Sequence, residues 1–255
     1  MARTRSPAAL TQDSPLRKAI ERYLTFLRAE ENKSPLTLQN YRESLDLLLA
    51  LSPVRDSKDF NKETVRSYKQ KLAEQKSRQG KELSLRTRNH HLTVLRAFLR
   101  YLVQEEELDV YPPDRVKRVK EEQRKVKVLY TDELERLLNA PDTSKREGKR
   151  DKAILELFFS TGMRLAELRS LSRKDLNFIT REISVRGKRN KLRVVFLSDG
   201  CVKTLKDYLE SRLDHLEPLF IRNHQLANTA MPPGENFRLS RISIYTMVKK
   251  YARLA

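Results

Sequence analysis

The sequence has little cysteine and glycine, and it lacks long apolar runs. A single cysteine, Cys201, excludes an internal disulfide, and nothing in the sequence indicates an oxidising compartment, so we expect a cytoplasmic protein. No apolar run approaches the ~20 residues that span a bilayer, so we expect no membrane partner. Only six glycines in 255 residues favour a mainly helical chain.

Positive charge is what the sequence has in excess. Fifty-three Lys and Arg against 34 Asp and Glu give a formal net charge of +19. Such an imbalance excludes most soluble enzymes of small metabolites and favours a polyanionic partner, most simply nucleic acid. A ribosomal or merely soluble basic protein is the alternative. A hydrophobic fraction of 38% is enough for one large or two ordinary domain cores.

The apolar periodicity divides the chain into four parts. Residues 1–14 are basic, rich in small residues and without an apolar stretch, so we expect a disordered lead-in. Residues 15–110 form an N-terminal domain with four predicted helices, at 15–30, about 35–50, from about 61, and 84–103. Residues 111–127 contain Pro112-Pro113 and many cations, which is typical of a linker between domains. Residues 128–255 form the second domain, in which we expect Thr131 to cap a helix, residues 142–149 to form a loop, and Ser240 to cap the last helix, as Ser34 does in the first domain.

Two of the predicted N-terminal helices have faces that suit DNA. Amides, hydroxyls and guanidinium groups of this kind can grip phosphates and contact base edges in the major groove. A solvated polar face is the alternative reading of the same residues. His90 and His91 are adjacent and point in different directions, so we expect no metal site there. The candidate DNA-binding residues are Thr37, Asn40 and Arg42 on the second helix, and Arg86, Thr87, Arg88, Asn89, His90 and Arg96 on the fourth.

The second domain is organised around residues 160–168. Gly162 is suited to end a helix in the left-handed conformation, and Arg164 and Glu167 then lie one turn apart on the next helix. Two predicted strands follow, at 182–185 and 192–197, and they enclose a cationic hairpin tip that contains Lys188. A planar guanidinium and a lysine on such a tip suit the binding and polarisation of one phosphodiester.

Two motifs in this order resemble the tyrosine recombinase (phage integrase) superfamily, and above all its Xer-like branch. They are Thr161-Gly162-x-Arg164-x-x-Glu167-Leu168 and Gly187-Lys188-x-Asn190-Lys191-x-Arg193, and the resemblance runs from about Leu16 to the last residue. It implies a mainly α fold of two domains. The first is a four-helix core-binding (SAM-like) domain that clamps DNA with its second and fourth helices. The second is an α+β catalytic domain with a small antiparallel sheet, incomplete at its C-terminus.

The resemblance also implies a reaction and roles for the motif residues. In this family a tyrosine attacks a phosphodiester, forms a 3′-phosphotyrosyl link, and is displaced by a 5′-hydroxyl, with no metal or other cofactor. By matching position, Arg164 binds the non-bridging oxygens and Lys188 protonates the leaving oxygen. Lys191 and Arg193 hold the flanking backbone. Glu167 orients neighbouring groups, or it is only a salt bridge or helix cap.

Part of the family's site has no counterpart in the sequence. No His-x-x-Arg follows the predicted strands, and the late tyrosines, Tyr245 and Tyr251, fall within the last predicted helix, so we expect no nucleophile among them. The sequence therefore predicts a truncated site-specific DNA recombinase that binds DNA but is inactive alone. The alternative is a natural DNA-binding regulator without chemistry. Expected partners are double-stranded DNA with an inverted-repeat site and, as for full-length relatives, further protomers in a tetramer on DNA.

Overall fold

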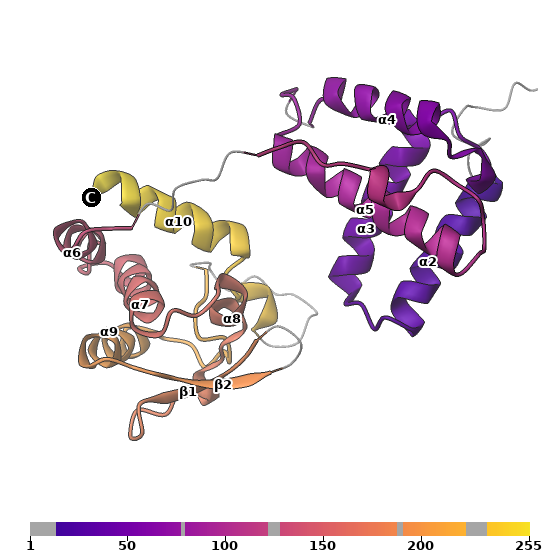
Figure 1. The fold of residues 1–255 in the computed structure, drawn as a ribbon. Coiled ribbons are helices and arrows are strands. Elements are labelled where there is room, and N and C mark those ends of the chain that lie inside the picture. Colours follow the sequence, from indigo (N-terminus) through magenta and orange to yellow (C-terminus); the bar gives the residue numbers. More distant parts are fainter. Residues whose placement is uncertain (1–13, 78–79, 122–127, 188–190, 223–233) are drawn as a thin grey trace, which may run out of the picture. The chain divides into compact units, whose positions relative to one another are not determined.

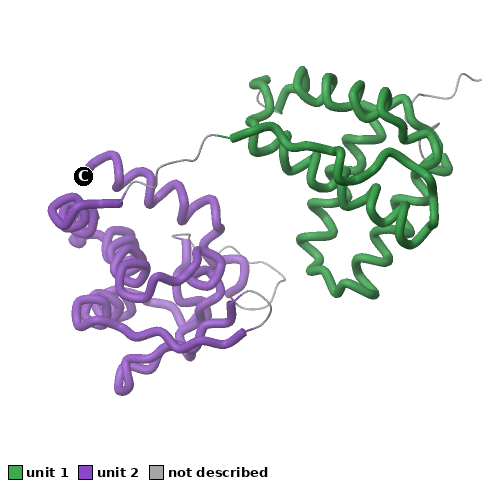
Figure 2. The backbone as a smooth tube through the Cα atoms, viewed as in Figure 1, with its two compact units in different colours: residues 1–125 green, residues 126–255 purple. Residues whose placement is uncertain are grey.

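The computed structural model of the chain describes residues 14–77, 80–121, 128–187, 191–222 and 234–255. The predicted lead-in, apart from Ser14, lies outside these residues. The chain divides into two compact units, residues 1–125 and 126–255 (Figure 2). No helix in the described ranges is long and apolar enough to cross a membrane.

Unit 1 contains the four helices that the sequence predicts (Figure 1). Two of them, α2 and α3, begin with a serine cap followed by proline, and α5 also begins with a serine cap. Each serine hydroxyl accepts a hydrogen bond from a backbone N–H three residues later. The elements in the described part of the unit are α2 (Pro15–Ala29), α3 (Pro35–Leu51), η1 (Ser57–Asp59), α4 (Lys62–Glu74), α5 (Leu85–Gln104) and η2 (Pro113–Arg115).

The core of unit 1 gathers around α5. Phe98 is completely buried, and its ring packs against Tyr23 at 5.4 Å and edge-on against Phe60 at 6.2 Å between centroids. Such tilted and edge-to-face arrangements are the favoured geometries of aromatic pairs. Because α5 is buried along one side only, its other side is left to carry polar groups.

The first part of the predicted linker packs against unit 1. Tyr111 donates its backbone N–H to the carbonyl of Phe60 at 2.7 Å, and Val116 is completely buried in the unit's core. Residues 111–121 therefore pack with unit 1 in the structure. The rest of the predicted linker, residues 122–127, lies outside the described residues.

Unit 2 combines helices with one small antiparallel sheet, which confirms the predicted fold class. Strands β1 and β2 pair so that Val185 lies opposite Arg193. The elements in the described part of the unit are α6 (Thr131–Asn139), α7 (Arg146–Thr161), α8 (Leu165–Ser170), η3 (Arg173–Asp175), β1 (Glu182–Arg186), β2 (Leu192–Phe196), α9 (Asp199–Glu210), η5 (Glu235–Phe237) and α10 (Arg241–Leu254).

One face of the sheet forms part of the core of unit 2. Ile183 of β1 and Ile154 and Leu157 of α7 are completely buried in one cluster. The side chains on the other face, such as Phe196, are exposed, as expected for a strand with one buried face. Strand β2 and the turn after α7 carry side chains of the candidate site.

Two predicted helix starts in unit 2 differ from the structure. Helix α6 includes Thr131 as its first residue, whereas the sequence predicted Thr131 as the cap before it. Helix α7 begins at Arg146, within the predicted loop 142–149. The reason is close packing: a Cβ on Gly148 would lie 1.8 Å from the carbonyl oxygen of Asp142, so the first turn of α7 folds onto that loop.

Candidate functional site

The turn between α7 and α8 presents Arg164 to solvent. Gly162 has φ 58° and ψ 20°, so it ends α7 in the left-handed conformation that the sequence predicted. Two residues later, Arg164 occupies the N-cap position of α8 with extended backbone angles. Its side chain is 66% exposed. The chain reversal at glycine therefore turns a guanidinium outward at the start of a short helix.

Three side chains meet at this turn, and we name them the Glu167 cluster: Arg164, Glu167 and Arg193. Glu167 Oε2 accepts hydrogen bonds from the backbone N–H of Arg164 and from Arg193 Nη2, both at 2.7 Å. Its Oε1 accepts from Arg164 Nη1 at 3.0 Å and from Arg193 Nη1 at 2.9 Å. One carboxylate thus links the start of α8 to strand β2.

Glu167 is ionised in the folded protein. Its side chain is only 5% exposed, yet the paired Arg193 guanidinium outweighs the cost of burial and, with Arg164, lowers the pKa of the carboxyl to about 2. The sequence offered two roles for Glu167, orienting neighbouring groups or forming a salt bridge or helix cap, and one carboxylate does both. Glu167 caps α8, forms salt bridges, and orients two guanidinium groups at once. With two cations and one anion, the cluster keeps a net positive charge.

The two arginines of the cluster have different geometries. Arg193 turns both terminal nitrogens toward Glu167 in a bidentate pair, a planar arrangement that fixes a guanidinium strongly. Glu167 thus engages both terminal nitrogens of Arg193, and the predicted contact of Arg193 with the flanking DNA backbone stays a prediction. Arg164 donates a single side-chain hydrogen bond within the described residues and stays largely exposed. Arg164 is the member of the cluster with capacity to bind an external anion.

Gly187, at the start of the hairpin, lies beside the cluster. The backbone N–H of Gly187 donates to the carbonyl of Lys191 at 2.8 Å. A Cβ on Gly187 would lie 3.3 Å from Arg193 Nη1 and 3.5 Å from Glu167 Oε1, so a side chain there would press on the Arg193 guanidinium. Lys191 is exposed at the hairpin's end. The predicted acid, Lys188, lies outside the described residues.

The predicted DNA-binding residues of α3 lie near its start. Asn40 is exposed, and Thr37 is half-buried with its hydroxyl 2.9 Å from that of Ser34. Arg42 donates from both terminal nitrogens to Glu21, at 2.5 and 2.8 Å. The charge of Arg42 is therefore partly compensated in the free protein.

The predicted residues of α5 lie in mixed surroundings. Arg86 and His90 are exposed, whereas Thr87, Arg88 and Arg96 are half-buried. The Nε atoms of Arg88 and Arg96 are buried and have no hydrogen-bond partner within the described residues. Unpaired buried donors of this kind are uncommon in folded proteins. Within the described ranges, this side of α5 retains unused hydrogen-bonding capacity.

Asn89 is a correction to the predicted DNA-binding set. It is only 7% exposed, and its side-chain amide bonds to the backbone of Val119 and to the carboxylate of Glu121. A buried amide with these partners is not available to contact a base edge. The prediction failed because the partner of Asn89 lies 30 residues away, beyond what helical periodicity can indicate.

The two late tyrosines differ in exposure. Tyr251 is buried, and its hydroxyl donates to Asp151 at 3.0 Å. Burial and the neighbouring carboxylate raise the pKa of Tyr251 to about 12. Tyr245 is exposed, and its ring lies 4.8 Å from the ammonium of Lys249. Tyr251 is thus a packing residue.

The pairing of Arg193 has a signal in the sequence. On β2, Arg193 lies two residues from the buried Val195, and side chains at this spacing share one face of a strand. A cation on the inward face needs a carboxylate nearby. Glu167, flanked by the apolar core residue Leu168, is the acid that meets this need.

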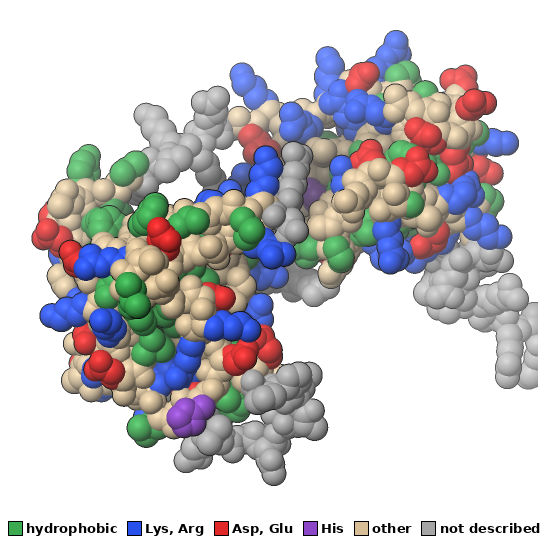
Figure 3. Space-filling model, turned by 90° about the horizontal axis from the view of Figure 1, so that it is seen from below, with side chains coloured by type: hydrophobic (Ala, Val, Ile, Leu, Met, Phe, Trp, Pro, Cys, Tyr) green, Lys and Arg blue, Asp and Glu red, His purple; other side chains and the backbone are tan. Residues whose placement is uncertain are grey.

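The molecular surface is basic on both units. On the face shown in Figure 3, Lys and Arg side chains are exposed on unit 1 and on unit 2. Within the described ranges, no group of three or more His, Cys, Asp or Glu side chains is placed to hold a metal ion.

Family models match both units of the chain. The model described as the phage integrase family matches residues 127–255. The model described as the phage integrase N-terminal SAM-like domain matches residues 20–106.

Curated relatives are named tyrosine recombinases. Tyrosine recombinase XerC of Haemophilus influenzae is 36% identical over 194 residues, which cover 76% of this chain and 64% of that protein. Tyrosine recombinase XerC of Bacillus subtilis is 31% identical over 192 residues, covering 75% of this chain and 62% of that protein. The chain thus spans a little less than two thirds of the length of these relatives.

Solved structures of similar fold include recombinases bound to DNA. A lambda integrase dimer bound to a COC′ core site gives a TM-score of 0.68 at 16% identity, covering 93% of this chain and 80% of that one. The XerH site-specific recombinase in a pre-cleavage complex with its difH substrate gives 0.60 at 18% identity, covering 93% and 69%. At these identities the likeness concerns the fold alone.

Proposed function

Because the chain belongs to the phage integrase family, we propose that it is part of a site-specific DNA recombinase, which cleaves and rejoins strands through a 3′-phosphotyrosine. The observation that carries this proposal is the Glu167 cluster. It places an exposed guanidinium, Arg164, on a buried carboxylate at the start of a helix. Gly187, at the start of the hairpin, lies beside the same carboxylate.

In this proposal Arg164 binds the non-bridging oxygens of the scissile phosphate. A guanidinium fits two phosphate oxygens with parallel N–H donors, and it stabilises the charge that develops during phosphoryl transfer. Glu167 fixes the direction of Arg164, and Arg193 in turn fixes Glu167. Arg193 is therefore a positioning residue. A donor that is already oriented avoids reorganisation when the phosphate binds.

We assign the proton donor for the leaving 5′-oxygen to Lys188, by the family motif. Its neighbour Gly187 lies close to Glu167, and the hairpin closes again at Lys191. General acid catalysis needs a donor within hydrogen-bond reach of the leaving atom. We propose that Lys188 meets this requirement when a phosphate is bound at Arg164.

No nucleophile is assigned to α10. The hydroxyl of Tyr251 is buried, bonded to Asp151 and held in its neutral form by a raised pKa. A nucleophilic tyrosine needs access to the phosphodiester and a path for its proton. We therefore expect the chain by itself to bind DNA without forming a covalent adduct.

The proposed partners are duplex DNA with an inverted-repeat site and further protomers of a recombinase. The net charge of +19 and the exposed cations of both units support a polyanionic partner. Related folds have been solved as a lambda integrase dimer on a core site and as a tetramer on a Holliday junction. We place the protein in the cytoplasm, where chromosomal DNA is accessible to it.

A non-catalytic DNA-binding regulator is the second candidate. It is favoured by the burial of Tyr251, since the described part of unit 2 then offers phosphate binding without a matched nucleophile. The two candidates share the DNA contacts and differ only in strand cleavage. Supplying a longer chain of the same gene, if it encodes one, to a nicked suicide substrate separates them.

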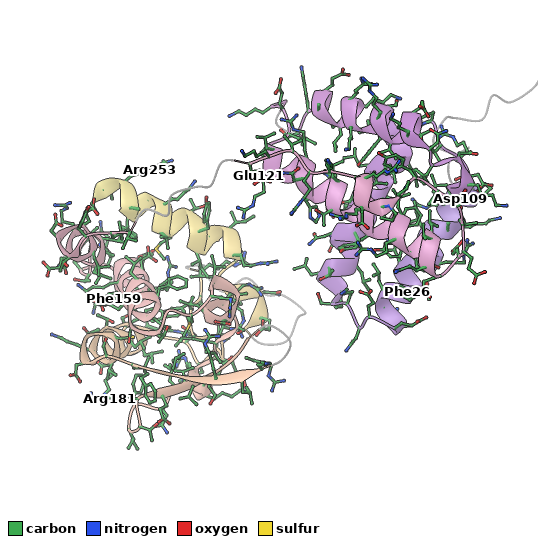
Figure 4. All side chains as sticks on the ribbon, in the orientation of Figure 1. Phe26, Asp109, Glu121, Phe159, Arg181 and Arg253 are labelled. Atoms are coloured by element: carbon green, nitrogen blue, oxygen red, sulfur yellow. The ribbon has the colours of Figure 1, made fainter. Side chains whose placement is uncertain are left out.

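The test of the proposed function compares Arg164→Ala with Arg181→Ala. Arg181 lies on the turn before β1 (Figure 4), is about half exposed, and pairs with the exposed Asp199, so its loss removes the same charge elsewhere on unit 2. A binding site is first selected from random-sequence DNA. We expect Arg164→Ala to weaken binding to the selected site more than to random DNA. Equal effects of both variants on both DNAs would contradict the assignment of Arg164.

A further inference from the structure

The side-chain amide of Asn89 binds both polar groups of one backbone residue. Its Nδ2 donates to the carbonyl of Val119 at 2.8 Å, and its Oδ1 accepts from the N–H of Val119 at 2.8 Å. Nδ2 also donates to Glu121 Oε1 at 2.5 Å. Side-chain amides that replace a partner strand in this way hold an extended segment in one register. Asn89 therefore fixes the position of the segment that follows η2.

That segment is anchored at further points. We name residues 115–121 the basic segment. Val116 is completely buried in the core of unit 1, and the carbonyl of Lys117 accepts a hydrogen bond from Lys69 of α4 at 3.1 Å. Burial lowers the pKa of Lys69, which is consistent with a lysine that packs against the segment. Glu121 lies beside the start of α5 (Figure 4).

The anchors leave the cations of the basic segment facing outward. Its four exposed cations are Arg115, Lys117, Arg118 and Lys120. Three of them, with Arg96 of α5, line one groove that also contains the carboxylates of Asp114 and Glu121. Arg96 bonds to Asp114 at 2.7 Å, and Glu121 is bonded to Asn89. Both carboxylates of the groove are thus already paired. The lysines of the groove, Lys117 and Lys120, can therefore bind an anion.

We infer that Asn89 is a positioning residue for DNA binding, which latches the basic segment onto α5 so that its cations meet the phosphate backbone as a fixed row. This inference rests on the proposed DNA binding. A segment that is already ordered does not lose conformational freedom when it binds, so each phosphate contact is made at a smaller entropic cost. Without the hydrogen bonds of Asn89, the same cations would lie on a flexible segment.

The first test is Asn89→Ala, with Thr93→Ala as the matched control. Thr93 lies one turn further along α5, is exposed, and donates only to the backbone carbonyl of Asn89, so its loss leaves the amide in place. The measurement is the slope of log affinity for duplex DNA against log salt concentration. Each phosphate contact contributes about 0.9 to this slope.

We expect Asn89→Ala to reduce the slope by about 1 to 3, and to weaken binding on the order of tenfold at low salt, because one to three contacts are lost. Thr93→Ala should keep the slope of the unaltered protein. A folded Asn89→Ala protein with an unchanged slope would overturn the inference. A merely structural role for Asn89 would lower stability but leave the slope of the folded protein as it was.

A second variant and a second measurement keep the inference testable if Asn89→Ala does not fold. Val119→Pro removes the N–H that Asn89 accepts, without touching α5. It should reduce the salt slope as Asn89→Ala does, and an unchanged slope would overturn the latch. In the unaltered protein, the amide proton of Val119 should be protected from hydrogen exchange. Exchange as fast as in an exposed peptide would overturn the latch without any use of DNA.

The two failures are distinguishable. If the unaltered chain does not bind duplex DNA, the proposed function fails, and the positioning role fails with it. If the unaltered chain binds with a steep salt slope and both variants keep that slope, only the role of Asn89 is refuted.

Discussion

Glu167 and Arg193 face each other through two parallel hydrogen bonds, 2.9 and 2.7 Å long, across 26 residues of the chain. The pair joins helix α8 to strand β2 and holds the carboxylate that also orients Arg164. Arg164 is therefore oriented by long-range pairing as well as by its own turn. The stability of unit 2 and the orientation of the Arg164 side chain depend on the same carboxylate.

Replacing Glu167 by glutamine should destabilise unit 2. Breaking a fully buried ion pair costs about 3–5 kcal/mol, and we expect about 2–3 kcal/mol here because the Arg193 side chain remains 38% exposed. Unfolding in urea, followed by a probe in unit 2, measures the change. The control is Glu210→Gln on the exposed end of α9, which should change the free energy of unfolding by less than about 0.5 kcal/mol. Equal effects of the two variants would contradict the role of Glu167.

The contribution of Glu167 should depend on pH in a defined direction. Its pKa is about 2 in the folded protein and near its ordinary value of 4.5 when unfolded, so the unfolded chain binds more protons between these values. The stabilisation is therefore present above about pH 5 and is lost as the pH falls toward 2. Urea midpoints of the unaltered protein and of Glu167→Gln should converge between pH 5 and pH 3. A constant difference over that range would show that the carboxyl is not selectively ionised in the fold.

Local chemistry predicted much of the architecture. Ser34 and Ser240 cap their helices as expected, and Gly162 ends α7 in the left-handed conformation. These features depend on neighbours three or four residues away, which the sequence shows directly. The start of α7 was wrong because it depends on the close approach of Gly148 to the backbone of Asp142.

The sequence did not show which side chains have distant partners. Asn89 was predicted to contact DNA, yet its amide is bonded to Val119, 30 residues away. Arg193 pairs with Glu167, 26 residues away, and its predicted contact with DNA stays a prediction. Composition and helical faces cannot indicate such pairings, because many residues share the same face. The predicted role of Lys188 and the predicted domain boundaries at 14, 110 and 127 stay predictions.

Releasing Arg42 from Glu21 should strengthen DNA binding. Glu21→Gln removes the carboxylate that now holds both terminal nitrogens of Arg42, so the guanidinium becomes available to a phosphate. We expect a gain in affinity on the order of threefold to tenfold at low salt, about one phosphate contact. Glu43→Gln on the same surface of unit 1 makes the same charge change and is the control, since Glu43 accepts from Gln39 instead.

A double-variant cycle identifies the source of that gain. Arg42→Ala in the Glu21→Gln background should abolish most of the increase. If the gain persists without Arg42, or if Glu43→Gln gives the same gain, general charge is responsible and Arg42 is not a DNA contact.

Tyr251 should matter for stability and not for chemistry. Tyr251→Phe removes the hydrogen bond to buried Asp151 and should cost about 1–2 kcal/mol in the free energy of unfolding of unit 2. Tyr245→Phe, on the exposed side of α10, should be nearly neutral. Neither tyrosine of the unaltered chain should form a covalent adduct with a nicked suicide substrate, as denaturing gels would show. An adduct that maps to Tyr251 would refute this assignment.

The most direct test of the central claim, that Arg164 on the Glu167 cluster binds one particular phosphate, is a scan of neutral methylphosphonates through the selected DNA site. Affinities of the unaltered chain and of Arg164→Ala are measured at each position. We predict one position where neutralising the phosphate weakens the unaltered chain but has little further effect on Arg164→Ala, because the same contact is lost twice. If every position weakens both proteins equally, Arg164 does not bind a single phosphate, and the account is contradicted.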